Sequence, residues 1–277
     1  MSKLKCRLLI DPPAAGAWNM AVDQALLDLV TQPVVRLYRW ETPTLSLGYF
    51  QATVDSEQHL ESRGCPVLRR STGGGAIMHD FELTYSLILP AELVQSKTSE
   101  LYDRVHRTVA AMLAEVGLTA LLHPSRPTVQ EPIEHGRSSN SSAVSVQREP
   151  FLCFQRRAVG DLILWPNAPT SGTHSADTVL GHKILGSAQR KRDGAVLQHG
   201  SILFQQSPRA PQLLGINDFL PTARRCDAMD FGLELIERFM SQFGWVWESS
   251  CLTDQETNVA QDYEQTRFSS PAWNALR

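Results

Sequence analysis

Long hydrophobic runs are absent from the 277-residue sequence, and none approaches the ~18 residues that a membrane-spanning helix requires. Lys3, Lys5 and Arg7 precede only a short apolar patch near the start, so neither a signal peptide nor a membrane anchor is expected. No C-x-x-C or H-x-x-x-H pair occurs, and a metal centre is therefore not predicted. The five cysteines are scattered and odd in number, which argues against a disulfide scaffold and indicates a cytoplasmic location.

A strong excess of one charge is also missing. The chain carries 26 Lys and Arg residues against 29 Asp and Glu residues, for a formal net charge of −3. This near-neutral total argues against sequence-independent binding to nucleic acid, which needs a strongly basic surface to displace the counterions of the phosphates. The hydrophobic fraction of 42% is that of an ordinary globular protein, and we expect residues 1–277 to form a single domain with a sizeable core.

Strand-like and helix-like runs alternate along the chain, which predicts a mixed α/β domain. Helices are expected at residues 17–30, 101–116 and 227–243. Strands are expected at residues 34–40, 65–70, 82–89, 161–164, 183–185 and 201–204, with residues 44–50 as the hairpin partner of 34–40. Residues 124–150 and 165–178 are rich in proline and polar side chains, and we expect both segments to be surface loops.

The densest motif is RRSTGGGAIMHD, from Arg69 to Asp80, which lies between two predicted strands. Three consecutive glycines let the backbone approach a ligand closely and expose N–H donors, while two arginines add positive charge. This combination suits a carboxylate, a phosphate or a polarised carbonyl. The spacing is not that of a P-loop, and a plain glycine-rich hairpin is the alternative.

A second motif runs from Gly181 to Arg190 and is followed by LQHGSIL at residues 197–203. Lys183 is expected in a strand between two glycine turns, where its ammonium could hold an anionic or carbonyl oxygen as a point charge. The alternative is a solvated strand lysine without such a role.

Together the two motifs resemble the signature segments of the lipoate-protein ligase and octanoyltransferase family, which shares its catalytic fold with biotin protein ligases. The resemblance covers nearly the whole chain apart from residues 124–150 and 165–178. It implies an α/β (α+β) fold of the biotin/lipoate protein ligase type, with mixed, mainly antiparallel sheets flanked by helices. One departure is Gly160-Asp161, because the family commonly places a polar residue before this acidic one.

The resemblance also implies an enzyme that attaches an octanoyl or lipoyl group to a lysine of a carrier domain. Cys153, within Phe151-Leu152-Cys153-Phe154, resembles the nucleophile of the cysteine-dependent octanoyltransferases. We therefore expect an octanoyl-[acyl carrier protein]:protein N-octanoyltransferase of lipoate biosynthesis that works through a thioester on Cys153. Three alternatives stay open: a buried structural cysteine, an ATP-dependent ligase that forms lipoyl-AMP, and a non-catalytic lipoate-binding homologue.

Site roles follow from the same resemblance. Cys153 and Lys183 are the expected catalytic residues. The residues expected to contact substrate are Arg70, Gly73, Gly74, Gly75, Ala76, His79, Gly186, Ser187, Ala188 and His199. The expected partners are octanoyl-acyl carrier protein and lipoyl carrier domains, such as the glycine cleavage H protein or the E2 of 2-oxoacid dehydrogenases. No cofactor is expected, and ATP with magnesium would enter only with the ligase alternative.

Overall fold

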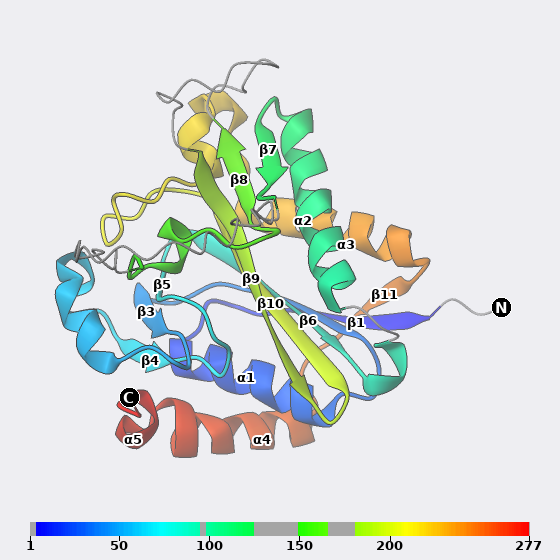
Figure 1. Cartoon of the computed structure of the whole chain (residues 1–277). Coiled ribbons are helices and arrows are strands. Elements are labelled where there is room, and N and C mark those ends of the chain that lie inside the picture. The colour runs from blue at the N-terminus through cyan, green and yellow to red at the C-terminus, as the bar shows by residue number, and fades with distance from the viewer. Residues whose placement is uncertain (1–3, 95–97, 125–148, 166–180, 277) are drawn as a thin grey trace, which may run out of the picture.

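The computed structural model describes residues 4–94, 98–124, 149–165 and 181–276. A mixed sheet of eight strands lies at the centre of the fold (Figure 1). In spatial order its strands are β11 (Val246–Ser249), β1 (Lys5–Ile10), β2 (Val34–Tyr38), β6 (Glu82–Leu89), β10 (Ala195–Leu203), β9 (His182–Arg192), β8 (Leu162–Trp165) and β7 (Thr119–Leu122). Within the described residues of this sheet, the β11–β1 and β1–β2 pairs are parallel and the other neighbouring pairs are antiparallel. A smaller sheet has the order β4 (Val67–Arg69), β3 (Thr44–Leu47) and β5 (Ile77–His79).

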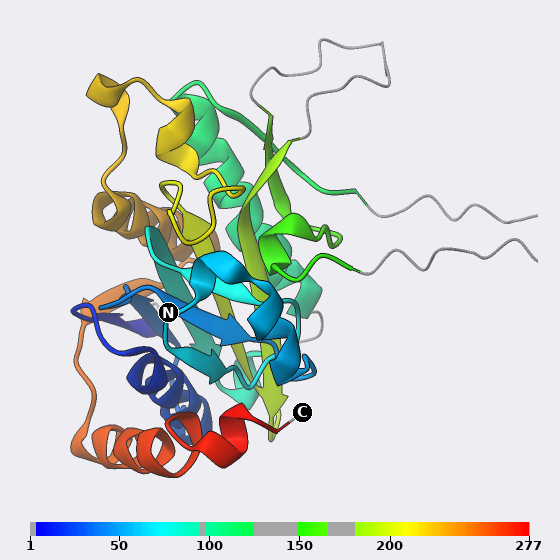
Figure 2. The same cartoon turned by 90° about the vertical axis from the view of Figure 1, so that its left-hand side faces the viewer.

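Helices cover both faces of the large sheet. They are α1 (Gly16–Leu29), α2 (Thr98–Glu115), α3 (Ala228–Phe243) and α4 (Asp254–Tyr263), whereas the short α5 (Pro271–Asn274) packs against β4 of the small sheet. Figures 1 and 2 place α1 and α4 side by side on one face, while α2 and α3 lie on the other. Among the described residues, no helix has the length and hydrophobicity needed to cross a bilayer.

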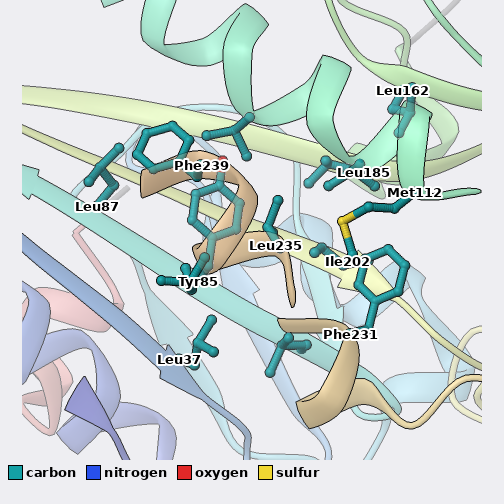
Figure 3. Close-up of a cluster of buried hydrophobic side chains, with 14 of the residues drawn as sticks. Leu37, Tyr85, Leu87, Met112, Leu162, Leu185, Ile202, Phe231, Leu235 and Phe239 are labelled. Atoms are coloured by element: carbon teal, nitrogen blue, oxygen red, sulfur yellow. The ribbon is translucent and has the colours of Figure 1, made fainter. Parts of the chain in front are cut away.

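The alternation of side chains along the central strands produces two separate cores. Leu37 packs with the α2 and α3 side of the sheet, whereas its neighbour Tyr38 packs with the α1 side. Figure 3 shows the first core, where Leu37 and Tyr85 of the sheet meet Phe231 and Phe239 of α3. Because both faces are covered, all residues of β2 are buried.

The predicted hairpin of residues 34–40 and 44–50 is wrong. Both sides of β2 are already occupied, by β1 and by β6, so β3 cannot pair with it. The turn after Trp40 instead carries the chain into the small sheet, where β3 pairs with β4 and β5. The alternation of apolar and polar residues identified the strands here, but it did not identify the strands with which they pair.

The strands predicted at 183–185 and 201–204 are parts of one long β9–β10 hairpin. Asp193 and Gly194 both have positive φ, 49° and 85°, as the tight turn between two twisted strands requires. Gly186 therefore lies inside β9 and not in a turn as predicted. The other predicted helices and strands are present, with ends shifted by a few residues at most. The segments predicted as surface loops, 124–150 and 165–178, lie outside the described residues except at their ends.

Candidate active site

A cavity of about 250 Å³ lies where β9 and β10 meet the segment from Arg70 to Ala76, here called the glycine loop. Its lining includes eight predicted site residues: Arg70, Gly73, Gly74, His79, Gly186, Ser187, Ala188 and His199. Cys153 also lines it. The sequence analysis missed the remaining lining residues, which are Met20, Tyr38, Trp40, Ile77, Thr84, Phe154, Gly200 and Ser201. Most of these are apolar or come from strands, so their sequence pattern was that of an ordinary core.

Backbone hydrogen bonds bring Cys153 to the glycine loop. The Ala76 N–H donates to the Phe151 carbonyl at 3.1 Å, and the Cys153 N–H donates to the Ala76 carbonyl at 2.7 Å. Cys153 then begins a short 3₁₀ turn that leaves its side chain partly exposed. Ala76 is fully buried and, like Gly75, is not among the residues that line the cavity, so their contact with substrate stays a prediction.

Lys183 and Asp161 form a buried ion pair beside Cys153. The Lys183 Nζ lies 2.8 Å from Asp161 Oδ2, and the two side chains are only 3% and 2% exposed. The same ammonium lies 3.7 Å from Cys153 Sγ and 3.4 Å from the Cys153 carbonyl oxygen. The thiolate is the form of cysteine that acts as a nucleophile, and the ammonium lies within reach of its sulfur.

Gly186 leaves the space that Lys183 needs. A Cβ at this position would lie 2.6 Å from Lys183 Cε and 2.9 Å from its Nζ. The lysine therefore folds back over the glycine of its own strand to reach Asp161. The sequence did not predict that Asp161, the acidic residue of the Gly160-Asp161 pair, would be the ion-pair partner of Lys183.

Arg70 holds the glycine loop from within. Its guanidinium donates to the carbonyl and the hydroxyl of Ser46, both at 2.7 Å, and to the carbonyls of Gly73 and Gly75 at 3.1 and 2.8 Å. Burial lowers the pKa of Arg70 to about 10, which leaves it charged near neutral pH. Gly74 has a φ of +95°, and a Cβ there would lie 3.8 Å from Cys153 Sγ, so the loop backbone passes directly over the sulfur.

His79 is fully engaged by protein groups. Its Nδ1 lies 2.7 Å from Glu82 Oε1 and its Nε2 lies 2.7 Å from Ser46 Oγ, while its ring stacks on Trp40. Burial lowers the pKa of His79, so the ring is neutral and Nδ1–H donates to the carboxylate. Nε2 then accepts from the Ser46 hydroxyl. His79 thus supports Ser46 and Arg70 and has no N–H left to donate to an acyl carbonyl.

Ser187 and His199 are likewise tied to neighbouring side chains. The Ser187 hydroxyl lies 2.7 Å from both Tyr85 Oη and His106 Nε2. His199 Nε2 lies 2.8 Å from Thr72 Oγ1 of the glycine loop, and its Nδ1 lies 3.5 Å from Asp23 Oδ2. These residues shape the cavity wall and connect β10 to the loop.

The arrangement suits acyl transfer. The cavity has a partly apolar lining, which includes Trp40, Gly73, Gly74, Ile77 and Phe154. Burial of each methylene of an acyl chain there would contribute about 0.8 kcal/mol of binding free energy. The Cys153 sulfur lines this cavity, and the Lys183 ammonium lies 3.7 Å from that sulfur without lining the cavity itself.

Gly48, just after β3, is expected to be essential for the shape of the glycine loop. A Cβ at Gly48 would lie 1.9 Å from the Gly74 carbonyl oxygen. The Gly48→Ala variant should therefore displace the loop and lower the free energy of unfolding by ~1–3 kcal/mol, measured by chemical denaturation. Gly73→Ala is the control, because its Cβ would meet only Phe50 at 3.7 Å or more. Equal unfolding free energies for the two variants would contradict the expected clash.

Comparisons with known proteins agree with this geometry. Residues 15–216 match the lipoyl protein ligase A/B catalytic domain. The octanoyltransferase LipM of Brevibacillus brevis is 31% identical over 98% of this chain and 99% of that protein. The octanoyltransferase LipM of Geobacillus kaustophilus is 29% identical over 100% of both.

Solved structures share the fold. Lipoate-protein ligase A bound with ATP has a TM-score of 0.69 and 20% identity over 100% of both chains. A bipartite lipoate protein ligase from Thermoplasma acidophilum has a TM-score of 0.68 and 19% identity, covering 100% of this chain and 98% of that one. These likenesses confirm the predicted fold class. Because the family match covers most of the chain and the Brevibacillus relative matches it end to end, the chain belongs to the lipoyl protein ligase A/B catalytic domain family.

Proposed function

We propose that this chain is an octanoyl-[acyl carrier protein]:protein N-octanoyltransferase of lipoate biosynthesis, with a thioester on Cys153 as its intermediate. The observation that carries the proposal is the Lys183 ammonium 3.7 Å from the Cys153 sulfur, beside an acyl-sized apolar cavity. The full-length relatives confirm that the chain is an acyltransferase.

In the first half-reaction, the Cys153 thiolate attacks the carbonyl carbon of the donor thioester. The new carbon–sulfur bond forms as the donor carbon–sulfur bond breaks, and the departing donor thiolate takes up a proton from solvent. The tetrahedral intermediate places negative charge on the former carbonyl oxygen, which the Lys183 ammonium stabilises. Asp161 holds that ammonium in place throughout.

In the second half-reaction, the neutral amine of the acceptor lysine attacks the Cys153 thioester. A carbon–nitrogen bond forms, the bond to the Cys153 sulfur breaks, and the proton lost by the amine passes to the released thiolate. The step runs downhill because an amide is more stable than a thioester. Lys183 again faces the developing oxyanion, so one ammonium serves both halves.

The partners follow from this chemistry. The donor we propose is octanoyl-acyl carrier protein, and the acceptors are lipoyl carrier domains such as the glycine cleavage H protein or the E2 of 2-oxoacid dehydrogenases. The Thermoplasma ligase was solved in a study that includes its E2 lipoyl domain, which supports an acceptor of this class. The cytoplasmic location and the absence of a required cofactor stay predictions.

A comparison of donors tests the proposal. The purified chain is incubated with octanoyl-acyl carrier protein or with free octanoate, ATP and magnesium, each with one lipoyl domain, and intact masses of both proteins are recorded. With octanoyl-acyl carrier protein as donor, we expect an octanoyl adduct on the enzyme and octanoyl modification of the lipoyl domain. With free octanoate, ATP and magnesium, we expect neither product. Modification from free octanoate and ATP would support the ligase alternative, and no modification from either donor would support a non-catalytic homologue.

A further inference from the structure

His106 is a buried titratable residue to which the proposed reaction assigns no role. It lies in α2 with no exposed surface, one helical turn after Tyr102, and the two rings stack with centroids 4.0 Å apart. His106 Nδ1 lies 2.8 Å from the Gly160 carbonyl oxygen, and Nε2 lies 2.7 Å from Ser187 Oγ. Its ring therefore joins the residue before Asp161 to a residue of the cavity wall.

The partners of His106 determine where its proton sits. A backbone carbonyl only accepts, so Nδ1 carries the hydrogen and donates it to Gly160. Burial lowers the pKa of His106 to about 3, so the ring is neutral and Nε2 accepts from the Ser187 hydroxyl. The Ser187 oxygen in turn accepts from Tyr85. Each of these hydrogen bonds has a defined direction.

The backbone at Gly160 is shaped to receive this contact. Gly160 has a φ of +86°, and a Cβ there would lie 2.9 Å from the Tyr102 ring. Its N–H donates to the His123 carbonyl at 2.9 Å, so both backbone polar groups of Gly160 are paired. A side chain at this position would meet the Tyr102 ring, so glycine suits both the backbone conformation and the space available.

Asp161 depends on the same few residues for its orientation. The Tyr102 hydroxyl donates to Asp161 Oδ1 at 3.1 Å, the Ala158 N–H donates to Oδ2 at 2.6 Å, and Lys183 pairs with Oδ2 at 2.8 Å. The carboxylate lies one peptide unit from the carbonyl that His106 holds. A shift of the Gly160–Asp161 peptide would therefore move the anchor of the Lys183 ammonium.

We propose that His106 is a positioning residue for octanoyl transfer: by holding the Gly160 carbonyl it fixes Asp161, which in turn aims Lys183 at Cys153. This inference rests on the proposed function. His106 does not touch the reacting atoms, and its effect passes through the Gly160–Asp161 peptide. Of its two hydrogen bonds, the one to Gly160 carries the effect and also sets the ring's tautomer, while the one to Ser187 satisfies Nε2.

Two neutral substitutions separate the two hydrogen bonds of His106. In His106→Asn the amide nitrogen occupies roughly the place of Nδ1 and can still donate to Gly160. In His106→Gln the longer amide reaches the place of Nε2 and can accept from Ser187, but the Gly160 carbonyl loses its donor. We measure single-turnover acylation of Cys153 by octanoyl-acyl carrier protein over a range of donor concentrations, together with thermal unfolding of each variant.

We expect His106→Gln to lower the acylation rate at saturating donor by at least about 10-fold with little change in the donor concentration for half-maximal rate, because a misplaced Lys183 affects the transition state. His106→Asn should stay within about 3-fold of the unsubstituted enzyme. Equal rates for His106→Gln and the unsubstituted enzyme, or equal losses in both variants, would overturn the positioning role. Failure of the unsubstituted enzyme to acylate Cys153 would instead overturn the proposed function.

Discussion

Substitution of Cys153 by serine is expected to reduce octanoyl transfer to a lipoyl domain by at least about 10⁴-fold. The thiolate is a far better nucleophile than a serine hydroxyl, and a serine would need a general base to lose its proton. Two imidazoles line the cavity, and both already have protein partners. His79 contacts Glu82 and Ser46, and His199 contacts Thr72 and Asp23. Nothing in that arrangement supplies a base for a serine.

The measurement is the rate of amide formation on the lipoyl domain, with the enzyme's intact mass followed in parallel. Cys65→Ser is a matched control, because Cys65 is also a free, partly buried cysteine and does not line the cavity. Its transfer rate should equal that of the unsubstituted enzyme. If Cys153→Ser keeps full activity, the mechanism through a Cys153 thioester is incorrect.

Replacement of Lys183 by methionine should have two separable effects. Transfer is expected to fall by about 10²–10³-fold, since the oxyanion loses its cationic partner. The free energy of unfolding should fall by about 3–5 kcal/mol, because the Asp161 carboxylate would be left buried without its ion-pair partner. Steady-state kinetics and chemical denaturation measure the two effects independently.

The double variant Lys183→Met with Asp161→Asn distinguishes catalysis from stability. Removing both charges eliminates the unpaired buried carboxylate, so much of the lost stability should return. Activity should not return, because the ammonium that faces Cys153 is still missing. Recovery of transfer along with stability would mean that Lys183 only supports the fold.

Much of the candidate site was accessible from local sequence motifs. The glycine loop, Cys153 and Lys183 stand in short segments whose residue types are unusual together. The structure brings the loop and Cys153 to one cavity and places the Lys183 ammonium 3.7 Å from the Cys153 sulfur. The motifs did not show which hydrogen bonds the site side chains make within the protein. His79 and Ser187 have their hydrogens committed to protein acceptors, which depends on groups from other strands and helices.

Local sequence patterns also could not predict which strands pair with each other. Residues 34–40 and 44–50 both read as strands, yet they belong to different sheets because β1 and β6 already occupy both edges of β2. Similarly, no local signal connects α2 to Gly160, although Tyr102 and His106 meet it through tertiary packing.

The sequence by itself determined the family, the mixed α/β class and the residue types that carry the chemistry, because these reside in contiguous motifs and periodicity. Only the tertiary structure decided that Asp161 holds Lys183, that Arg70 supports the glycine loop, and that His106 faces Gly160. Side chains far apart in sequence become partners only when the packing of sheet and helices removes them from water. In that setting an unpaired buried charge or N–H is costly, so most of them find a partner, and the partner depends on the whole fold.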